Sequence, residues 1–167
     1  PIAAPSDHSP VEGDHAPEIR RARLKDYRAQ LAAPASPLFE ELRKIIREHE
    51  LPAGLFADLL DAFAQDVTKK RYADFAELLD YCRRSANPVG RLLLHLFKRT
   101  SDSNLAASDS ICTALQLINF WQDVDVDYTK DRRVYLPQDE MARFGVAEQH
   151  LRDKVCDPAF QALMRFE

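Results

Sequence analysis

The sequence predicts an all-α protein, and three features of composition and pattern support this. The 167 residues include only 4 glycines, which disfavours a turn-rich β protein. Ala, Leu, Arg, Glu and Lys, which favour helices, are abundant. Apolar residues recur along most of the chain at the three- and four-residue spacing of one helical face. This length suits a single domain with a buried core and is short for two.

The N-terminal half divides at its prolines. Residues 1–16 are expected to form a flexible arm, because they combine Pro, Ser, Asp, His and Gly without helical periodicity. A charged surface helix is expected over 17–33, where the apolar residues keep to one face. Prolines separate it from a second helix over 38–49, and a further proline precedes a third over 53–68.

A kinked helical stretch is expected next. Residues 73–86 and 89–97 both have helical patterns, but Asn87 and Pro88 lie between them. Proline lacks the backbone N–H that an α-helix uses, and the residue before proline tends to leave the α region. The two segments are therefore expected to meet at an angle. Such a kink either fits one helix around its neighbours or shapes the wall of a cavity.

The most apolar helix is expected over about 108–127, after a polar loop at 98–104. Apolar side chains point in most directions around it, which is typical of a buried helix. At about 100° per residue its polar residues fall at roughly 0°, 300°, 340° and 20°, which is one narrow stripe: Gln116, Asn119, Asp123 and Asp127. Beyond this helix a charged loop is expected at 128–134. Further short helices are expected over 137–144, over 147–155 and from 158 onward.

Two residues of this stripe, Asp123 and Asp127, suggest a metal site. A buried carboxylate without compensation is strongly unfavourable, and like charges four residues apart on a helix repel each other. A hard divalent cation reverses that repulsion, and Mg²⁺ prefers oxygen ligands and substrate phosphates. The alternative is that both carboxylates lie on a solvated helix end and pair with the basic residues that follow them: Lys130, Arg132 and Arg133.

Two sequence blocks resemble the squalene and phytoene synthases, a family of all-α prenyltransferases. The first block is QLINFWQDVDVD at 116–127, followed by RVYLP at 133–137, and is similar to the second aspartate-rich motif of that family. The second block comprises QDVTKKRY at 65–72 and LDYCRRSANPVG at 79–90. The SANPVG run and the NFWQDV form of the acidic motif are most similar to the hydroxysqualene synthase branch of bacterial hopanoid biosynthesis. The resemblance covers roughly residues 12–146.

The resemblance implies an isoprenoid-synthase helical bundle around a central cavity, of which residues 17–167 form a part. It also implies that Mg²⁺ binds Asp123 and Asp127 and pulls on a diphosphate, with Asn119 as a further candidate ligand. Tyr72 is the third catalytic residue that it implies, because the faces of Tyr72 and Phe120 would stabilise a carbocation. The residues expected to bind the substrate are Arg71, Asn87, Gly90, Gln116, Asn119, Phe120, Lys130 and Arg133.

One motif departs from the family's form. The resemblance places a first aspartate-rich motif, Asp-Asp-x-x-Asp, just before residue 12. Asp7 matches its first carboxylate, whereas His8 and Val11 replace the other two and Pro10 would interrupt a helix. The arm 1–16 is therefore expected to carry a degraded acidic motif, so that only one set of carboxylates is intact.

The expected activity, by resemblance, is the Mg²⁺-assisted ionisation of presqualene diphosphate and capture of the cation by water, which gives hydroxysqualene. Presqualene diphosphate synthase and phytoene synthase are the alternatives within the family, so the expected ligand is presqualene or farnesyl diphosphate. A third alternative is an inactive fragment, or a helical partner of an active homologue, because family members extend further at both ends. Uncovered apolar helix faces would then favour a homodimer.

Charge, hydropathy and cysteine content set limits on partners and location. A net charge of -4 without a concentrated basic face argues against nucleic-acid binding. No apolar run approaches the roughly 18 residues that span a bilayer and no signal peptide is recognisable, so a cytoplasmic location is expected. The prenyl substrate makes peripheral contact with the inner membrane face a further expectation. The three cysteines fit free, buried thiols in a reducing compartment, and the 5 histidines form no ligand cluster.

Overall fold

The computed structural model describes residues 16–167, and within them the chain forms ten α-helices and no strand. The all-α prediction is confirmed. The arm predicted at 1–16, with the degraded motif around Asp7, lies outside the described residues except for Ala16. The helices are α1 (Pro17–Ala32), α2 (Pro37–Glu48), α3 (Ala53–Asp66), α4 (Phe75–Ser85), α5 (Asn87–Leu96), α6 (Asp102–Gln122), α7 (Val124–Asp131), α8 (Gln138–Arg143), α9 (Glu148–Arg152) and α10 (Pro158–Phe166).

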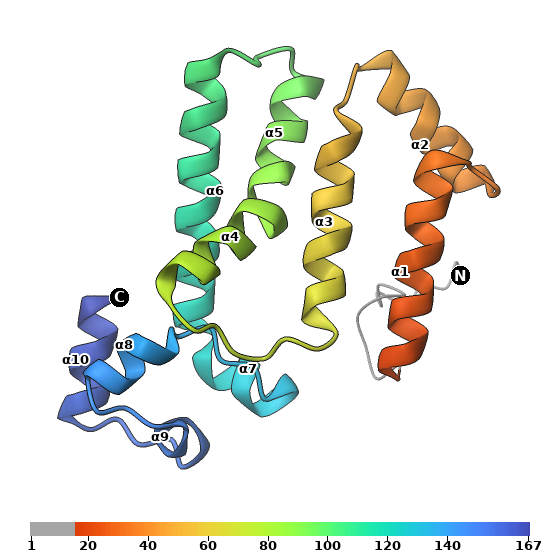
Figure 1. Ribbon diagram of the computed structural model, residues 1–167. Coiled ribbons are helices and arrows are strands. Elements are labelled where there is room, and N and C mark those ends of the chain that lie inside the picture. Colours follow the sequence, from red (N-terminus) through yellow and green to blue (C-terminus); the bar gives the residue numbers. More distant parts are fainter. Residues whose placement is uncertain (1–15) are drawn as a thin grey trace, which may run out of the picture.

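The helices form an extended row with a small lobe at one end (Figure 1). Helices α3, α5 and α6 stand side by side, and α4 packs against all three of them. Helix α1 covers the outer side of α3, and α2 packs on α1. Helix α7 turns away from the end of α6, and α8, α9 and α10 form the small lobe beyond it. Among residues 16–167, no helix is both long and apolar enough to cross a bilayer.

Two main clusters of buried side chains hold these parts together, and Trp121 of α6 packs against both. The first cluster lies where α3, α4 and α6 meet, and is rich in aromatic rings. The second forms the interior of the small lobe. The first cluster contains Ala62, Tyr72, Leu78, Tyr81, Cys82, Leu117, Phe120 and Tyr135. The second contains Tyr128, Val134, Leu136, Met141, Val146, Leu151 and Leu163.

The predicted kink and the predicted stop of α8 are both confirmed. Helix α4 ends at Ser85 and α5 begins at Asn87, with Pro88 in its first turn, where its missing N–H is not needed. Helix α8 is followed by Gly145, whose φ of +71° lies in the left-handed region that glycine adopts without strain.

Three expectations were wrong in detail. The charged loop expected at 128–134 is helical as far as Asp131, because Tyr128 packs into the small lobe, and Arg132 at φ +54° then ends α7. The polar loop at 98–104 is shorter than expected, because the side chain of Ser101 accepts a hydrogen bond from the backbone N–H of Asn104 and caps α6. Cys156 is exposed in the turn before α10, whereas Cys82 is buried and Cys112 is partly buried.

Helices α5 and α6 leave one broad apolar surface uncovered. Their backbones approach closely, because a Cβ on Gly90 would overlap the side chain of Ser108 and lie 2.5 Å from Cys112 Sγ. Beside this contact, large apolar side chains on both helices are about half exposed to solvent, from 44% to 60%. We call these residues the open apolar face: Val89, Leu93, Ile111, Leu115 and Ile118.

Candidate functional site

The acidic pair lies at the junction of α6 and α7. Helix α6 ends at Gln122, and Asp123 is the residue between the two helices. The Asp127 N–H donates to the Asp123 carbonyl at 2.8 Å, so helical spacing continues through the junction. Asp123 is exposed and Asp127 is partly buried. The two carboxylates therefore share one turn, as their spacing predicts.

The electrostatic environment of Asp127 favours a cation. Partial burial raises the pKa of its carboxyl above the ordinary value, the positive charge of Arg133 opposes this, and the negative charges of Asp123 and Asp131 add to it. A carboxylate that is desolvated beside other carboxylates gains stability when a divalent cation binds to it. Within residues 16–167, however, no group of three or more His, Cys, Asp or Glu residues could hold a metal ion. The pair can supply two oxygen ligands, and further ligands would have to come from substrate, water or Asn119.

A row of residues four apart leads from the open apolar face on α6 to the acidic pair at the start of α7. Each fourth residue from Ile111 is a neighbour of the next one on the helix surface, although the row turns by about 40° with each step and its last member lies in α7. The first four residues of this row are exposed and the last is partly buried. From apolar to acidic end they are Ile111, Leu115, Asn119, Asp123 and Asp127, and we call them the α6 ridge.

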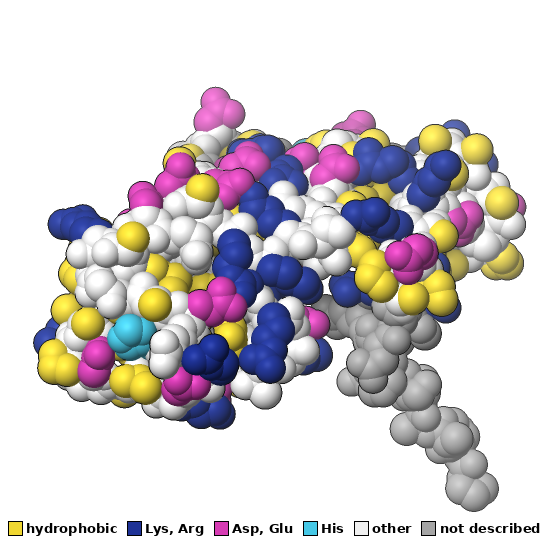
Figure 2. All heavy atoms as spheres, turned by 60° about the horizontal axis from the view of Figure 1, so that its bottom comes forward, with side chains coloured by type: hydrophobic (Ala, Val, Ile, Leu, Met, Phe, Trp, Pro, Cys, Tyr) yellow, Lys and Arg dark blue, Asp and Glu magenta, His cyan; other side chains and the backbone are white. Residues whose placement is uncertain are grey.

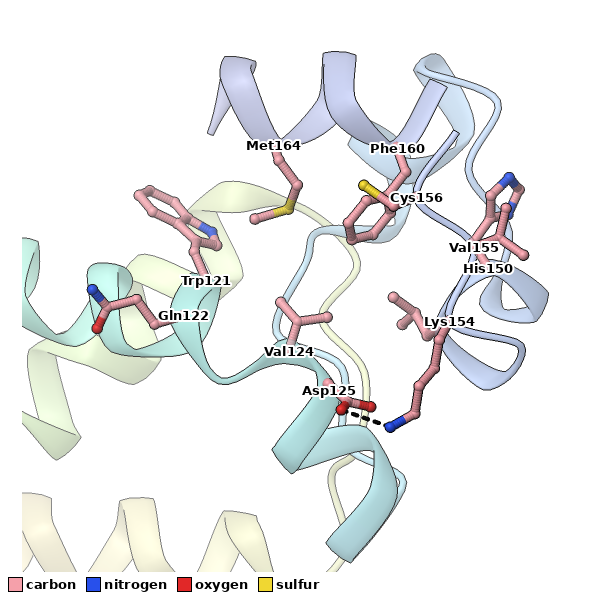
Figure 3. Close-up of a pocket in the computed structure, with 11 residues that line it drawn as sticks. Trp121, Gln122, Val124, Asp125, His150, Lys154, Val155, Cys156, Phe160 and Met164 are labelled. Atoms are coloured by element: carbon pink, nitrogen blue, oxygen red, sulfur yellow. Dashed lines mark hydrogen bonds and ion pairs between the residues drawn. The ribbon is translucent and has the colours of Figure 1, made fainter. Parts of the chain in front are cut away.

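A separate hollow lies on the other side of α6 and α7 and does not serve the acidic pair. It has a volume of about 300 Å³ and lies between the α6–α7 junction and the small lobe (Figure 3). The ion pair between Lys154 and Asp125, 2.8 Å long, lies at its edge. Neither Asp123 nor Asp127 lines it. The acidic pair therefore lies outside this hollow.

The aromatic residues predicted for the site lie in the core behind the ridge. Tyr72 is fully buried, and its hydroxyl accepts a hydrogen bond from Gln65 Nε2 at 3.2 Å. Phe120 is buried and stacks on Tyr135 with ring centroids 3.6 Å apart. The Tyr72 ring also stacks on Tyr135 at 5.5 Å. Burial raises the pKa of Tyr72 far above its ordinary value, so its hydroxyl stays neutral.

Arg133 connects this aromatic cluster to the acidic pair. Its backbone N–H donates to the Asp127 carbonyl at 3.2 Å. Its guanidinium donates to the Asp66 backbone carbonyl at 2.9 Å and to the Tyr135 hydroxyl at 3.3 Å. The guanidinium is therefore fixed by contacts to α3 and to the segment after α7.

Arg71 is held by another part of the chain. Its guanidinium forms an ion pair with both carboxylate oxygens of Glu148 on α9, and also donates to the backbone carbonyls of Lys70 and Arg132. In this arrangement Arg71 ties the end of α7 to the small lobe. To bind a substrate phosphate as predicted, Arg71 would have to give up Glu148.

Basic side chains gather on the face that is lowest in Figure 1, as Figure 2 shows. Both the connection between α3 and α4 and the end of α7 reach this face. Lys130 and Arg132 are exposed at the end of α7, and Lys70 lies close enough to Arg133 for the two charges to interact. Burial and the positive charge of Arg133 lower the pKa of Lys70. An anion bound here would relieve this repulsion between cations.

Comparison with known proteins gives the same assignment as the motifs. Residues 9–167 match the squalene/phytoene synthase family. The chain belongs to this family. It is 36% identical over 154 residues to a hydroxysqualene synthase of Rhodopseudomonas palustris, covering 92% of this chain and 52% of that protein. It is 33% identical over 139 residues to a phytoene synthase of Mycobacterium tuberculosis, covering 81% of this chain and 46% of that protein.

The fold agrees with solved structures of the squalene/phytoene synthase family. The crystal structure of squalene synthase HpnC from Alicyclobacillus acidocaldarius superposes with a TM-score of 0.81 at 32% identity, covering 96% of this chain and 60% of that one. A dehydrosqualene synthase in complex with ligand gives a TM-score of 0.77 at 26% identity, covering 89% and 54%. The prediction of an all-α isoprenoid-synthase fold is confirmed. The chain spans about half the length of the relatives it matches.

Asn87 and Gly90, which the family resemblance places at the substrate, pack α5 against α6. The Asn87 side-chain oxygen accepts a hydrogen bond from Thr113 Oγ1 at 2.9 Å. Gly90 provides the space that Ser108 and Cys112 fill. Their part in substrate binding stays a prediction, as do those of Gln116, which is partly buried, and Asn119, which is exposed.

The residues that organise the buried side of the site were not predicted from the sequence. The Tyr81 hydroxyl donates to Asp66 Oδ2 at 2.6 Å, and the Tyr81 ring contacts those of Tyr72, Phe120 and Tyr135. One signal was available in the sequence. Tyr81 lies on the same face of α4 as Leu78, and a tyrosine on an apolar face requires a buried hydrogen-bond partner.

Proposed function

We propose that this chain carries the diphosphate-binding part of a prenyl-diphosphate enzyme in squalene and hopanoid biosynthesis. The proposed reaction is the ionisation of presqualene diphosphate, followed by capture of the cation by water to give hydroxysqualene. The observation that carries the proposal is the α6 ridge, a row of neighbouring residues that begins with Ile111 and Leu115 of the open apolar face and ends with the two carboxylates, the second of them in α7. A prenyl diphosphate likewise has a charged part and an apolar part, because its diphosphate head is attached to a hydrocarbon chain.

The residues fit Mg²⁺ as the cation at the head group. Asp123 and Asp127 supply two carboxylates in one turn, and the environment of Asp127 disfavours an uncompensated negative charge. When bound, the ion would neutralise the diphosphate and make it a better leaving group. Arg133 and Lys130, which follow the acidic pair in the chain, would stabilise the departing charge. The open apolar face would hold the hydrocarbon chain away from water.

The buried aromatic cluster supports the choice of a cationic reaction. Each of its four rings lies within 6.0 Å of at least two of the others, measured between centroids, and the face of a neutral ring attracts a cation. The 36% identity to a hydroxysqualene synthase favours water capture as the final step. The 33% identity to a phytoene synthase supports that activity, or presqualene diphosphate synthesis from farnesyl diphosphate, as the alternative.

A thermal-stability titration tests the head-group site. Mg²⁺ with a non-hydrolysable farnesyl diphosphate analogue is expected to raise the melting temperature in a saturable way, since a ligand at about 100 times its Kd contributes about 2.7 kcal/mol. Asp123→Asn should abolish the shift. Asp125→Asn is the matched control, because Asp125 lies in the same turn but pairs with Lys154. Equal shifts in both variants, or none in the wild type, would contradict the proposal.

An inactive fragment or a helical partner of an active homologue is the second candidate. The open apolar face favours it, because uncovered apolar surface promotes association with another chain, and the same face could lie against a membrane surface. Sedimentation separates these outcomes from the enzymatic one. A concentration-dependent dimer that Leu115→Glu dissociates, without any response to Mg²⁺ and analogue, would support the partner role over the enzyme.

A further inference from the structure

Three residues from separate parts of the chain meet at the end of α7. Arg71, between α3 and α4, donates to both carboxylate oxygens of Glu148 on α9, with Nε 3.1 Å from Oε2. Its Nη1 also donates to the backbone carbonyl of Arg132, the residue that ends α7. Arg71 is 77 positions from Glu148 and 61 from Arg132 in the sequence, so only the fold brings them together. We call these three residues the Arg71 clasp.

Arg132 has a backbone conformation that needs support. Its φ of +54° lies in the left-handed region, which side chains other than asparagine and aspartate rarely adopt. The turn at Arg132 reverses the chain, and the Arg133 N–H then donates to the Asp127 carbonyl at 3.2 Å. The Arg132 N–H donates to the Tyr128 carbonyl at 3.0 Å. Because Arg71 donates to the carbonyl of Arg132, this hydrogen bond stabilises the turn.

Helix α7 has little other support at this end. It contains only 8 residues, and helices this short are marginal unless tertiary contacts hold them. Tyr128 is its only buried residue. Asp127, the partly buried member of the acidic pair, directly precedes Tyr128. The placement of Asp127 therefore depends on the packing of Tyr128 and on the turn at Arg132.

The contacts of Arg71 leave it little capacity to bind a phosphate. Its Nε and Nη2 donate to Glu148, and its Nη1 donates to the carbonyls of Arg132 and Lys70. Every nitrogen of the guanidinium therefore has a partner in the protein. The hydrogen bond from Arg71 is the largest of the effects that lower the pKa of the Glu148 carboxyl, so Glu148 stays ionised at neutral pH. Two-point binding of this kind fixes direction as well as distance.

We propose that Glu148 is a positioning residue for the acidic pair, and that it acts through Arg71. The pair of side chains fixes the turn at Arg132, and this turn holds Asp127 in place for Mg²⁺ and the diphosphate. This inference rests on the function proposed above. It gives Arg71 an indirect part in substrate binding, because Arg71 acts on the backbone of α7. A direct contact between Arg71 and the phosphate would instead make Glu148 a competitor of the substrate.

Analogue binding to Glu148→Gln tests the inference, because the two roles of Glu148 predict opposite results. Glutamine keeps the shape of the side chain but loses its charge and one acceptor oxygen. Titration calorimetry with Mg²⁺ and the non-hydrolysable farnesyl diphosphate analogue should show binding about 10-fold weaker than in the wild type. Tighter binding would identify Glu148 as a competitor and overturn the inference, and so would unchanged binding.

Asp109→Asn is the matched control for this titration. Asp109 on α6 binds Arg91 on α5 at two points, with distances of 2.8 and 2.5 Å, so the variant weakens an ion pair of the same kind away from α7. It should leave the affinity for the analogue unchanged. An equal loss of affinity in Asp109→Asn and Glu148→Gln would show that any weakened ion pair has this effect, and would overturn the inference.

Hydrogen exchange at the end of α7 tests the inference without a ligand. The Arg133 amide should exchange about tenfold faster in Glu148→Gln, because the turn before it loses support. Arg71→Lys should have the same effect, since lysine cannot bind Glu148 at two points and reach Arg132 as well. The Val146 amide, which donates to the Met141 carbonyl in the small lobe, is the internal control and should be unaffected.

Unchanged exchange at Arg133, or equally faster exchange at Arg133 and Val146, would overturn the inference. If the wild-type protein does not bind the analogue at all, the proposed function fails. The exchange rates still decide in that case whether Glu148 fixes the end of α7.

Discussion

The two sides of α6 have similar composition but different surroundings. On one side, Leu117 and Phe120 are 7% and 4% exposed and pack into the aromatic cluster. On the other side, Ile111 and Leu115 are 60% and 56% exposed on the open apolar face. The difference shows that an apolar helix face does not define a core by itself. The buried side fixes the position of the acidic pair, whereas the uncovered side is available to a ligand or to another polypeptide.

Substitutions on the two sides of α6 should differ most in how much they lower the free energy of unfolding. Phe120→Ala should lower the free energy of unfolding by about 3–5 kcal/mol, because it leaves a cavity beside Tyr135. Leu115→Ala should change it by less than about 0.5 kcal/mol, because the side chain is already largely hydrated. Urea denaturation of both variants measures the difference. Similar losses would mean that the open apolar face is covered in solution, so that the two sides of α6 do not differ in burial.

The close contact between α5 and α6 should be the next most sensitive feature. Gly90→Ala is expected to destabilise the protein by about 1–3 kcal/mol, because the new methyl group overlaps Ser108 and Cys112. Gly54→Ala is the matched control in a helix, and no atom lies within 4 Å of its added methyl group. It should stabilise α3 by up to about 1 kcal/mol. Opposite signs in thermal melts support the packing role of Gly90, and a harmless Gly90→Ala would contradict it.

The pH dependence of stability should reveal the buried carboxylate behind the ridge. The pKa of Asp66 is raised in the folded protein, so the folded state binds more protons than the unfolded state between the ordinary value of 3.8 and the raised value. The contribution of Asp66 to stability is therefore greatest at low pH and decreases as pH rises through this window. Asp66→Asn removes the titration. Denaturation between pH 3.5 and about 7 should show the wild type losing stability relative to Asp66→Asn as pH rises.

Several groups around Asp66 affect the pKa of its carboxyl. They are Tyr81, Arg133, Lys70 and Arg20. Tyr81 does not change charge over this range, because burial raises its pKa far above its ordinary value. A difference between wild type and Asp66→Asn that stays constant with pH would show that the Asp66 carboxyl is not perturbed by burial.

The rates of thiol labelling should differ among the three cysteines, and this is the smallest and most local of the expected effects. Cys156 is exposed and should react first, and Cys112, partly buried beside the open apolar face, should react more slowly. Cys82 lies in the aromatic cluster, where burial raises its pKa to about 12, and should react only on unfolding. A prenyl diphosphate analogue that covers the open apolar face should slow Cys112 without affecting Cys156. Equal protection of both thiols would point to a general change in stability.

The sequence alone determined the helices, the kink before Pro88 and the spacing of the acidic pair. These features depend on hydrogen bonds and side-chain contacts only a few residues apart, so local periodicity and residue type are sufficient to predict them. The same local pattern carries the family motifs, and residues 9–167 match the family as a whole. For the same reason Asp123 and Asp127 could be recognised as a pair before their surroundings were known.

Only the tertiary structure decided which residues meet across the chain. Arg71 binds Glu148, Tyr81 binds Asp66, and Arg133 donates to the Asp66 backbone, all at sequence separations that local periodicity does not describe. The end of α7 was mistaken for a loop, because its helical state depends on the packing of Tyr128 into the small lobe. The exposure of a side chain also depends on the tertiary structure. Whether Leu115 is core or surface depends on what covers α6, and that is a property of packing.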